Sequence, residues 1–520
     1  MKDEIIFRDE LKDEWEANEV YAILADCDKD FEPPLSERGS TVQKTWEKKS
    51  GDGVRNYFNE VAKQHTFLLK REKRIIAFLS FRSMEECEAL KNYRDICYFT
   101  TLCIRKEYRG QGLALVLYQK AKEYVEESSR YTVMALRTWS TNKTQLHLME
   151  KMDFHCETRL KNDRGEGIDT LYFVKEITGK GIRAYGYTIG NGKCGIRNTI
   201  TDVPGVKVGH YTVRKGKNQT GVTVIIPCDG FVYERKPLAA VYALNGFGKT
   251  QGTVQIEELG VLETPIALTN TLNVGKAADG LVTFTEKECR KNGKELVSVN
   301  PVVGETNDSR INQITERVIE AEDVLFAIEH AEKNFKQGAV GAGRGTVCFG
   351  LKGGIGSASR ILTFGGTAYT IGVLVQSNFG KTQDLTVAGV PVGRQICTKI
   401  QNSAKEDKGS IMVIVGTDLP LGERQLKRVL KRAAVGLIRT GSFMGHGSGD
   451  VFIGFTNANG IPDTEEEQFH RMKYFPENQL DKVFRLVAEA VEESILNSLT
   501  CAKAMPGRDG KIYHSLSEFL

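Results

Sequence analysis

The chain has 520 residues, of which 40% are hydrophobic and 27% charged, and its net charge is +4. This length exceeds what one hydrophobic core usually serves, so we expect at least two domains. The small net charge argues against a nucleic-acid or anionic membrane partner, and no apolar run approaches the roughly 18 residues of a membrane span.

The N-terminus and the cysteines favour a cytoplasmic protein. The first residues, MKDEIIFRDELKDE, are acidic and lack the basic region and apolar stretch of a signal peptide. Eleven cysteines are scattered along the chain without a C-x-x-C pair, which is typical of reduced thiols that need neither a metal nor a disulfide. We therefore expect a cytoplasmic protein without a metal site.

The first third of the chain alternates strand-like and helix-like segments. Apolar runs predict strands at 65–70 (HTFLLK), 75–81 (IIAFLSF) and 96–104 (ICYFTTLCI). From about Leu113 to Val125 the apolar residues recur at helical spacing, which predicts an amphipathic helix.

A glycine-containing turn joins the last of these strands to the helix. Arg109, Gly112 and Ala114 follow the pattern R-x-x-G-x-A. Small residues at this place let free backbone N–H groups at the helix N-terminus approach a phosphate, whose charge the helix dipole favours. An ordinary β-to-α turn, in which glycines only relieve strain, is the alternative. The order of strand, turn and helix is the one that a pyrophosphate site requires.

Over roughly residues 50 to 176 the chain resembles the GNAT family of acyl-CoA-dependent N-acetyltransferases. The resemblance implies a mixed sheet with helices and acetyl-CoA as cofactor. It implies that the pantetheine arm meets the backbone of Leu102, Cys103 and Ile104. It also implies that the pyrophosphate is held by Arg109, Gly110, Gln111, Gly112, Leu113 and Ala114.

A second segment, TNKTQLHLMEKMDF (141–154), resembles the family pattern N-x-x-A-x-x-x-L-Y-x-K-x-G-F, with Asn142 matched. Met149 occupies the usual tyrosine position, so the customary proton donor to the leaving thiolate is absent, and Asp153 replaces the usual glycine. CoA binding is therefore the firmer expectation. The alternative to acetyl transfer is a domain that only binds CoA or serves assembly.

The domain boundary is expected in EITGKGIRAYGYTIGNGKCGIRN (176–198), where apolar periodicity disappears and six glycines fall between Gly179 and Gly195. We predict an N-terminal domain over 1–178, a linker or the start of the next domain over 179–197, and a C-terminal domain over 198–520. In the second half, short strands rich in valine and isoleucine mix with amphipathic helices predicted at 311–331, 424–439 and 480–499. Both halves are expected to be α/β or α+β.

Three loops of the second half carry weak motifs. ALNGFGKTQG (243–252) invites a phosphate-loop interpretation, but Ala243 stands where that pattern requires glycine. The glycine-rich segment 338–360 is interrupted by the predicted strand TVCFGL (346–351), which indicates close backbone packing. His446 lies beside Ser448; we interpret it as a loop histidine, with a histidine-based triad as the alternative.

Ser410 stands between two very different pieces of chain. The polar stretch AKEDKG (404–409) predicts an exposed loop, and IMVIV (411–415) predicts a strand buried on both faces. A surface turn is the simple interpretation of Gly-Ser. If the bond before Ser410 were cut, however, the new α-amine, with a pKa of roughly 8, would lie beside the hydroxyl that needs a base.

Six segments favour a cut before Ser410 over a simple surface turn. Together and in order they resemble the DmpA family of L-aminopeptidase/D-esterases, β-aminopeptidases and related amidases. They are 198–212, 258–275, 301–308 (PVVGETND), 374–380 (LVQSNFG), 409–421 (GSIMVIVGTDLPL) and 447–459 (GSGDVFIGFTNAN). The resemblance implies an αββα sandwich, self-cleavage between Gly409 and Ser410, and a homo-oligomer of the paired fragments. It implies a small peptide or aminoacyl amide as substrate, and a peptidase domain without cofactor.

Residue by residue, the resemblance makes Ser410 the nucleophile and Asn378 the group that stabilises the oxyanion. It makes Ser448 and Asp450 a polar relay near the nucleophile, although Gly-Ser-Gly-Asp could also be a turn leading into a strand. Asn307 stands where many members have a tyrosine.

The chain is thus expected to be an autoprocessed serine aminopeptidase or amidase fused to an N-acetyltransferase-like domain. Ornithine acetyltransferases share the overall fold and self-cleavage but use a threonine nucleophile. An acyl-enzyme captured by an amine instead of water is therefore the alternative for the C-terminal domain.

Overall fold

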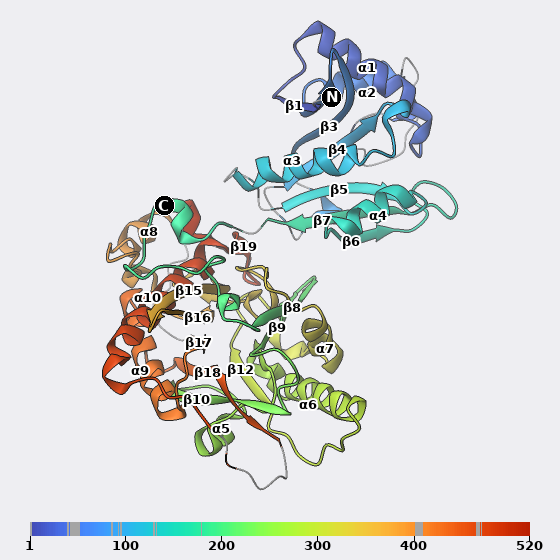
Figure 1. The fold of residues 1–520 in the computed structure, drawn as a ribbon. Helices are drawn as coiled ribbons and strands as arrows, with labels where there is room; N and C mark the ends of the chain where they lie inside the picture. The colour runs from blue at the N-terminus through green and yellow to red at the C-terminus, as the bar shows by residue number, and fades with distance from the viewer. Residues whose placement is uncertain are drawn as a thin grey trace. The chain divides into compact units, whose positions relative to one another are not determined.

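The computed structural model describes residues 3–38, 41, 53–84, 87–91, 93, 96–127, 131, 133–177, 179–400, 409–463, 469 and 471–520. The chain divides into two compact units, Met1–Ile177 and Thr178–Leu520 (Figure 1). Within the described ranges, no helix is both long enough and apolar enough to cross a membrane.

The first unit is built on one seven-stranded sheet, in the order β1-β2-β3-β4-β5-β7-β6. Its strands are β1 Asp3–Arg8, β2 His65–Arg71, β3 Arg74–Met84, β4 Ile96–Ile104, β5 Val133–Trp139, β6 His155–Leu160 and β7 Thr170–Glu176. Its helices are α1 Glu14–Cys27, α2 Gly53–Val61, α3 Leu113–Glu127 and α4 Lys143–Lys151. The predicted strands at 65–70, 75–81 and 96–104 and the predicted helix from 113 are confirmed.

The helices cover both faces of this sheet because successive strand residues point to opposite sides. Phe67 and Leu69 of β2 pack in one core with residues of α3 and α4. Leu68 packs in a second core with residues of α1 and α2. The sheet is therefore the middle layer of a three-layer α/β unit.

The glycine-rich segment 179–198 is packed against α10 (Leu480–Thr500) of the second unit. The backbone N–H of Ile182 donates to Asn497 Oδ1 at 2.8 Å, and Arg183 Nε lies 2.6 Å from Glu493 Oε1. A Cβ at Gly179 would lie 2.1 Å from the Thr500 carbonyl oxygen, so this close approach requires glycine.

The second unit is an αββα sandwich, as predicted. The five-stranded sheet has the order β10-β18-β17-β16-β15 and the four-stranded sheet the order β12-β11-β9-β8. The strands are β8 Lys207–Lys215, β9 Asn218–Ile226, β10 Arg235–Gly246, β11 Ile266–Asn270, β12 Val302–Thr306, β15 Ile355–Phe364, β16 Thr367–Asn378, β17 Ser410–Thr417 and β18 Gly449–Pro462. The helices are α5 Thr253–Leu259, α6 Val274–Lys291, α7 Ala321–Glu329, α8 Gly393–Lys399, α9 Glu423–Arg439 and α10.

Three hydrophobic cores hold these four layers together. The helices α9 and α10 pack on the outer face of the five-stranded sheet, and α6 and α7 pack on the outer face of the four-stranded sheet. The inner faces meet in the central core. Alternation along β17 places Ile411 and Val413 under the helices and Met412 and Ile414 in the central core.

Two element predictions in this unit are wrong, whereas the helices predicted at 424–439 and 480–499 are confirmed as α9 and α10. The helix predicted over 311–331 is shorter than expected. The structure has a short 3-10 turn at Ile314–Glu316 and an α-helix only at α7. That turn ends at Arg317, whose φ is +50°, and a new helix starts after Glu320, whose backbone N–H donates to Asp323 Oδ2 at 2.9 Å.

The single strand predicted at 346–351 is instead a tight hairpin. It consists of β13 (Val347–Cys348) and β14 (Leu351–Lys352), and the chain reverses at Phe349 and Gly350, whose φ values are +53° and +73°. The short strands β19 (Met505–Pro506) and β20 (Ile512–Tyr513) form a second small hairpin.

Candidate active site

Ser410 is the first residue of β17, in the middle of the five-stranded sheet. It pairs with Asn378 at the end of β16 and with Gly449 at the start of β18. Because alternate residues of a strand point to the same face, the Ser410 side chain lies on the same face as Met412 and Ile414, which face the central core. Ser410 is 7% exposed. The exposed loop predicted before it falls mainly on residues 401–408, which lie outside the described residues.

Gly409 is held tightly just before this strand. Its carbonyl oxygen accepts a hydrogen bond of 3.0 Å from the backbone N–H of Gly449. A Cβ at Gly409 would lie 1.9 Å from the carbonyl oxygen of Asn378, closer than any real contact. The Gly409 carbonyl is therefore both fixed and polarised next to Ser410.

The Asn378 side chain is oriented by two backbone groups. Its Oδ1 accepts from the backbone N–H of Val347 at 2.9 Å, and its Nδ2 donates to the Asn307 carbonyl oxygen at 3.0 Å. These contacts fix which end of the amide is nitrogen. A primary amide nitrogen carries two N–H groups, so one remains beyond the bond to Asn307.

Asp308, next to Asn307, is a buried carboxyl. It accepts hydrogen bonds from Thr220 Oγ1 at 2.5 Å and Asn312 Nδ2 at 3.0 Å. Burial raises the pKa of Asp308 to about 6 despite these bonds. This network fastens the end of β12 to β9.

Ser448 and Asp450 form a hydrogen-bonded pair at the start of β18. Ser448 Oγ donates to Asp450 Oδ1 at 2.7 Å, and both side chains are fully buried. Asn245, at the end of β10, clamps the preceding turn because its Nδ2 donates to the carbonyl oxygens of Gly445 and Ser448 at 2.9 and 2.7 Å.

Ser410 opens into a cavity of about 710 Å³. Its lining includes Gly409, Ser410, Glu305, Asn307, Lys249, Lys381, Phe247, Phe443 and His446. Glu305 is 3% exposed, and its carboxylate accepts from the Lys249 backbone N–H at 2.9 Å and from the Thr271 hydroxyl. The Ser410 hydroxyl and the buried carboxyl group of Glu305 therefore line the same cavity.

Two of the weak sequence motifs, the one with Lys249 and the one with His446, lie at this cavity. The backbone N–H of Lys249 faces the Glu305 carboxylate, which is the opposite of a phosphate cradle. His446 lies 6.4 Å from Phe247, ring to ring, and within the described part of the chain no hydrogen bond joins it to Ser410 or Ser448.

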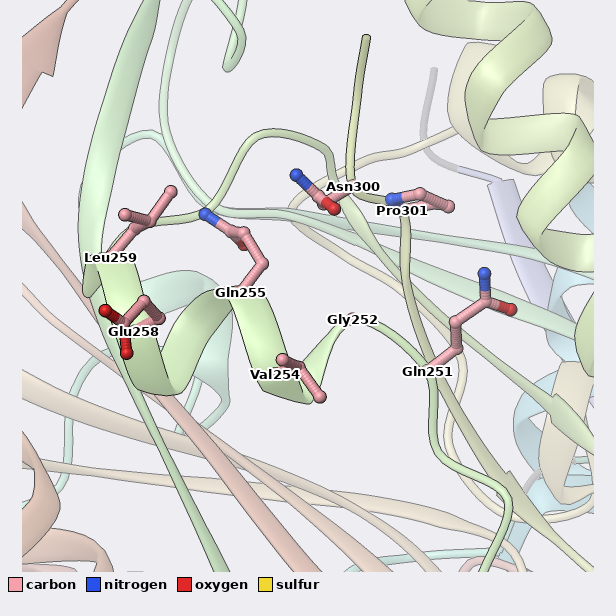
Figure 2. A pocket seen from close by; sticks show the side chains of 8 residues that line it. All are labelled: Gln251, Gly252, Val254, Gln255, Glu258, Leu259, Asn300 and Pro301. Atoms are coloured by element: carbon pink, nitrogen blue, oxygen red, sulfur yellow. The ribbon is translucent and has the colours of Figure 1, made fainter.

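A second cavity, of about 440 Å³, lies between α5 and residues Asn300 and Pro301, which directly precede β12 (Figure 2). The Gln255 amide on its wall is 8% exposed and has no hydrogen-bond partner among the described residues. None of the predicted site residues lines this cavity.

In the first unit, the predicted pyrophosphate loop presents free donors. Gly110 and Gly112 both have φ of +76°, a conformation that favours glycine. Among the described residues, no acceptor is found for the backbone N–H groups of Gly110, Gln111, Gly112, Leu113 and Ala114, which lead into the first turn of α3. This set of donors fits a pyrophosphate. The Arg109 guanidinium instead contacts Asp30 Oδ2 at 2.6 Å and donates to the Ile104 carbonyl oxygen at 3.1 Å.

The other predicted CoA-contacting residues surround the end of β4. Leu102 and Ile104 are partly buried on the side of α3, whereas the Cys103 side chain lies in the core under α1. Asn142 caps α4 because its Oδ1 accepts from the Gln145 backbone N–H at 3.2 Å. Met149 is fully buried.

Three groups around Ser410 were not singled out from the sequence: Glu305, Asn245 and the backbone N–H of Gly449. Glu305 stands inside the quoted motif PVVGETND, and an acid at the end of an apolar strand was a signal that could have found it. The contacts of the Asn245 side chain with Gly445 and Ser448, and of the Gly449 N–H with Gly409, join segments far apart in the sequence or backbone atoms, neither of which leaves a motif.

Comparison with known proteins agrees with this geometry. Residues 198–513 match the model of Peptidase family S58, and residues 19–154 match that of the Acetyltransferase (GNAT) family. A "Beta-peptidyl aminopeptidase BapA" from Sphingosinicella microcystinivorans is 36% identical over 61% of this chain and 85% of its own length. The relative of that name from Sphingosinicella xenopeptidilytica is 34% identical over 62% of this chain and 85% of its own.

Solved structures resemble the second unit. The PH0078 protein from Pyrococcus horikoshii OT3 is 46% identical, with a TM-score of 0.62, over 65% of this chain and 96% of its own. A Burkholderia sp. beta-aminopeptidase is 37% identical, with a TM-score of 0.60, over 65% and 96%. The L-aminopeptidase D-Ala-esterase/amidase of Ochrobactrum anthropi, described as a variant of the Ntn hydrolase fold, is 33% identical, with a TM-score of 0.61, over 65% and 95%.

Proposed function

The chain belongs to peptidase family S58, and from this membership we propose that Ser410 is the N-terminal nucleophile of an aminopeptidase that frees itself by cutting after Gly409. The observation that carries the proposal is the meeting of three strands at Ser410. There the hydroxyl lies beside a carbonyl that is already hydrogen-bonded to Gly449.

Self-cleavage uses the groups around Gly409. Ser410 Oγ attacks the Gly409 carbonyl carbon, and the Gly449 N–H, 3.0 Å from the carbonyl oxygen, stabilises the negative charge that develops there. The C–N bond breaks, the acyl group moves to Oγ, and water hydrolyses the ester. The products are a carboxylate on Gly409 and a free amine on Ser410.

The same groups then serve an external substrate. The freed amine of Ser410 takes the hydroxyl proton as Oγ attacks the substrate's acyl carbon. The remaining N–H of Asn378 and the N–H of Gly449 stabilise the oxyanion. The Ser448–Asp450 pair, joined at 2.7 Å, assists proton movement, and water releases the acyl group from Oγ.

The cavity supports a substrate with a free amino group. The buried carboxylate of Glu305 faces the same cavity as Ser410, and an ammonium group is its natural partner. This arrangement suits a small peptide, aminoacyl amide or ester. The names of the relatives add β-aminoacyl and D-alanyl substrates to the classes worth testing.

The first unit is proposed to bind acetyl-CoA, because its family generally binds this cofactor and the free N–H groups of 110–114 fit the pyrophosphate. Bound there, acetyl-CoA would supply an activated acetyl group. The backbone at 102–104 would align its pantetheine arm.

We also propose a cytoplasmic homo-oligomer of the paired fragments. Eleven free cysteines support a reducing compartment. Light scattering of the purified protein tests the oligomer, and cell fractionation tests the compartment.

A substrate panel tests the hydrolase. L-, D- and β-aminoacyl p-nitroanilides are incubated with the purified protein, with and without acceptor amines. We expect release of p-nitroaniline and a free amino acid, and little dependence on the acceptor. Release that requires the amine and forms an acylated amine would instead show an acyl transferase of the ornithine acetyltransferase type.

A further inference from the structure

Several arginines lie close together on one face of the first unit's sheet. Arg38 Nη2 and Arg164 Nη1 both donate to the same carbonyl oxygen, that of Glu32. The Arg38 guanidinium lies 5.1 Å from the Phe31 ring centroid, and that of Arg164 lies 5.3 Å from the Trp139 ring centroid. The two aromatic rings are themselves 6.0 Å apart. Two cations are thus held side by side on a shared aromatic and carbonyl support.

Arg137 of β5 belongs to the same group. It lies two residues before Trp139, so both side chains point to the same face of the sheet. Leu136 points to the other face, into the core under α3. Burial and the charges of Arg38 and Arg137 lower the pKa of Arg164 to about 9, as expected where like charges crowd; Asp163 partly offsets them.

A buried hydroxyl completes the group. Tyr98 of β4 is 1% exposed, and its OH has no hydrogen-bond partner among the described residues. The positive charges of Arg137 and Arg164 act on this hydroxyl. Arg82 of β3 pairs directly with Tyr98, and its Nε is also buried without a partner in the described part of the chain. A buried hydroxyl left without a partner is costly, so a ligand that accepts its hydrogen bond would stabilise the protein.

The group lies where the two central strands separate. β4 and β5 are paired only from Ile96 to Phe99 and from Val133 to Leu136. Beyond these pairs β4 continues to Ile104, which is the predicted pantetheine-contacting end, and β5 continues through Arg137 to Trp139. With the pantetheine arm along the end of β4, as proposed, the thioester would lie at this opening, and the arginines would flank an acceptor amine that approaches it.

We propose that Arg38, Arg137, Arg164 and Tyr98 bind the carboxylate of a free amino acid whose amine accepts the acetyl group. Guanidinium groups and a hydroxyl are matched donors for a carboxylate. The inference rests on the proposed hydrolase in one respect, the source of the substrate. Hydrolysis gives each released amino acid a new carboxylate in addition to its amine, so the second unit would supply the substrate of the first. In the transfer, the amine nitrogen forms a bond to the acetyl carbon and the C–S bond breaks. The proton lost by nitrogen balances the one gained by the CoA sulfur.

Calorimetry on the full-length Ser410→Ala protein, which cannot hydrolyse the ligands, tests the site with CoA present. β-Alanine and L-alanine are compared with their amides, and each acid is expected to bind at least about tenfold more tightly. Arg137→Met, Arg164→Met and Tyr98→Phe should each reduce acid binding by about tenfold or more and leave amide binding unchanged. Arg8→Met, which removes an arginine paired with Glu16 elsewhere in the same unit, should change neither.

Two results would overturn the inference. One is equal binding of acids and amides. The other is that the arginine variants bind CoA more weakly but still bind the amino acids more tightly than their amides. That result would assign these arginines to the phosphates of CoA. If Arg137→Met does not fold, Tyr98→Phe, which keeps the ring, and Arg164→Met decide. Because these measurements use no hydrolysis, a failure of the aminopeptidase proposal would appear separately, as an inactive wild-type protein in the p-nitroanilide assay.

Discussion

At the scale of single residues, the hydrolase site depends on groups that do no bond-making themselves. The Asn378 amide is held in one orientation, because the Val347 N–H donates to its Oδ1 at 2.9 Å and its Nδ2 donates to the Asn307 carbonyl oxygen at 3.0 Å. The carboxyl group of Glu305, which is 3% exposed, is held in place by hydrogen bonds from the Lys249 backbone N–H and the Thr271 hydroxyl. Both side chains are thus oriented by the protein itself, as the proposed electrostatic stabilisation of a transition state would require.

Replacing Asn378 by alanine tests the oxyanion role. Turnover of an aminoacyl p-nitroanilide should fall by roughly a hundredfold or more, the usual cost of losing one oxyanion donor. KM should change less, because the oxyanion exists only near the transition state. Asn292→Ala, at the exposed end of α6, is the control. Normal kcat with a raised KM would make Asn378 a substrate contact instead.

Replacing Gly112 by aspartate tests the pyrophosphate loop. An added Cβ would meet no atom within 4 Å, so the change acts through the positive φ of +76° and through a negative charge where phosphate is expected. Acetyl-CoA affinity, measured by calorimetry, should fall at least about tenfold while hydrolase activity survives. Gly167→Asp is a matched control, since its φ is +77° and its Cβ also meets nothing within 4 Å. Unchanged CoA binding in a folded Gly112→Asp protein would contradict the loop assignment.

At the scale of elements, three adjacent strands build the proposed hydrolase site. β16 contributes Asn378 at its last residue, β17 contributes Ser410 at its first, and β18 starts at Gly449. Antiparallel pairing of β16 with β17 and parallel pairing of β17 with β18 bring these three ends together. A buried strand starting at Ser410 was predictable from the run IMVIV, but its neighbours were not, because strand order carries no local signal.

The same limit explains the wrong helix prediction at 311–331. Its apolar spacing suits a helix, yet Asn312 is tied to β9, since its Oδ1 accepts from the Gln219 backbone N–H at 3.1 Å. Long-range contacts override local periodicity at such places. Likewise, the contact of Arg109 with Asp30, 79 residues away, could not be predicted from the R-x-x-G-x-A pattern.

Replacing Gly409 by alanine tests the packing of β16 against β17. The added Cβ would lie 1.9 Å from the Asn378 carbonyl oxygen, so the Gly409 carbonyl must move away from Ser410 Oγ or from Gly449. Such a displacement should slow self-cleavage by roughly a hundredfold. The uncut chain should then accumulate on denaturing gels. Gly275→Ala, whose Cβ meets nothing within 4 Å, should cut normally; equal cutting rates of the two variants would contradict this role of Gly409.

At the scale of the whole molecule, one chain forms two units with separate cores, and we propose a different chemistry for each. The αββα sandwich and the GNAT assignment were predictable, because each family leaves several ordered motifs in the sequence. The arginine group around Tyr98 was not, because its members come from segments spread between residues 38 and 164, which carry no common motif. The proposed order of reactions, hydrolysis followed by acetylation of the released amino acid, would give the fusion a chemical reason.

The most direct test of the account is the state of the chain in active enzyme. Denaturing electrophoresis with N-terminal sequencing should show two chains, of 409 and 111 residues, with the smaller beginning Ser-Ile-Met-Val. Ser410→Ala should remain a single inactive chain, because it lacks the hydroxyl that attacks Gly409. An active enzyme that proves to be one intact chain of 520 residues, or a small fragment that begins at another residue, would contradict the proposed mechanism.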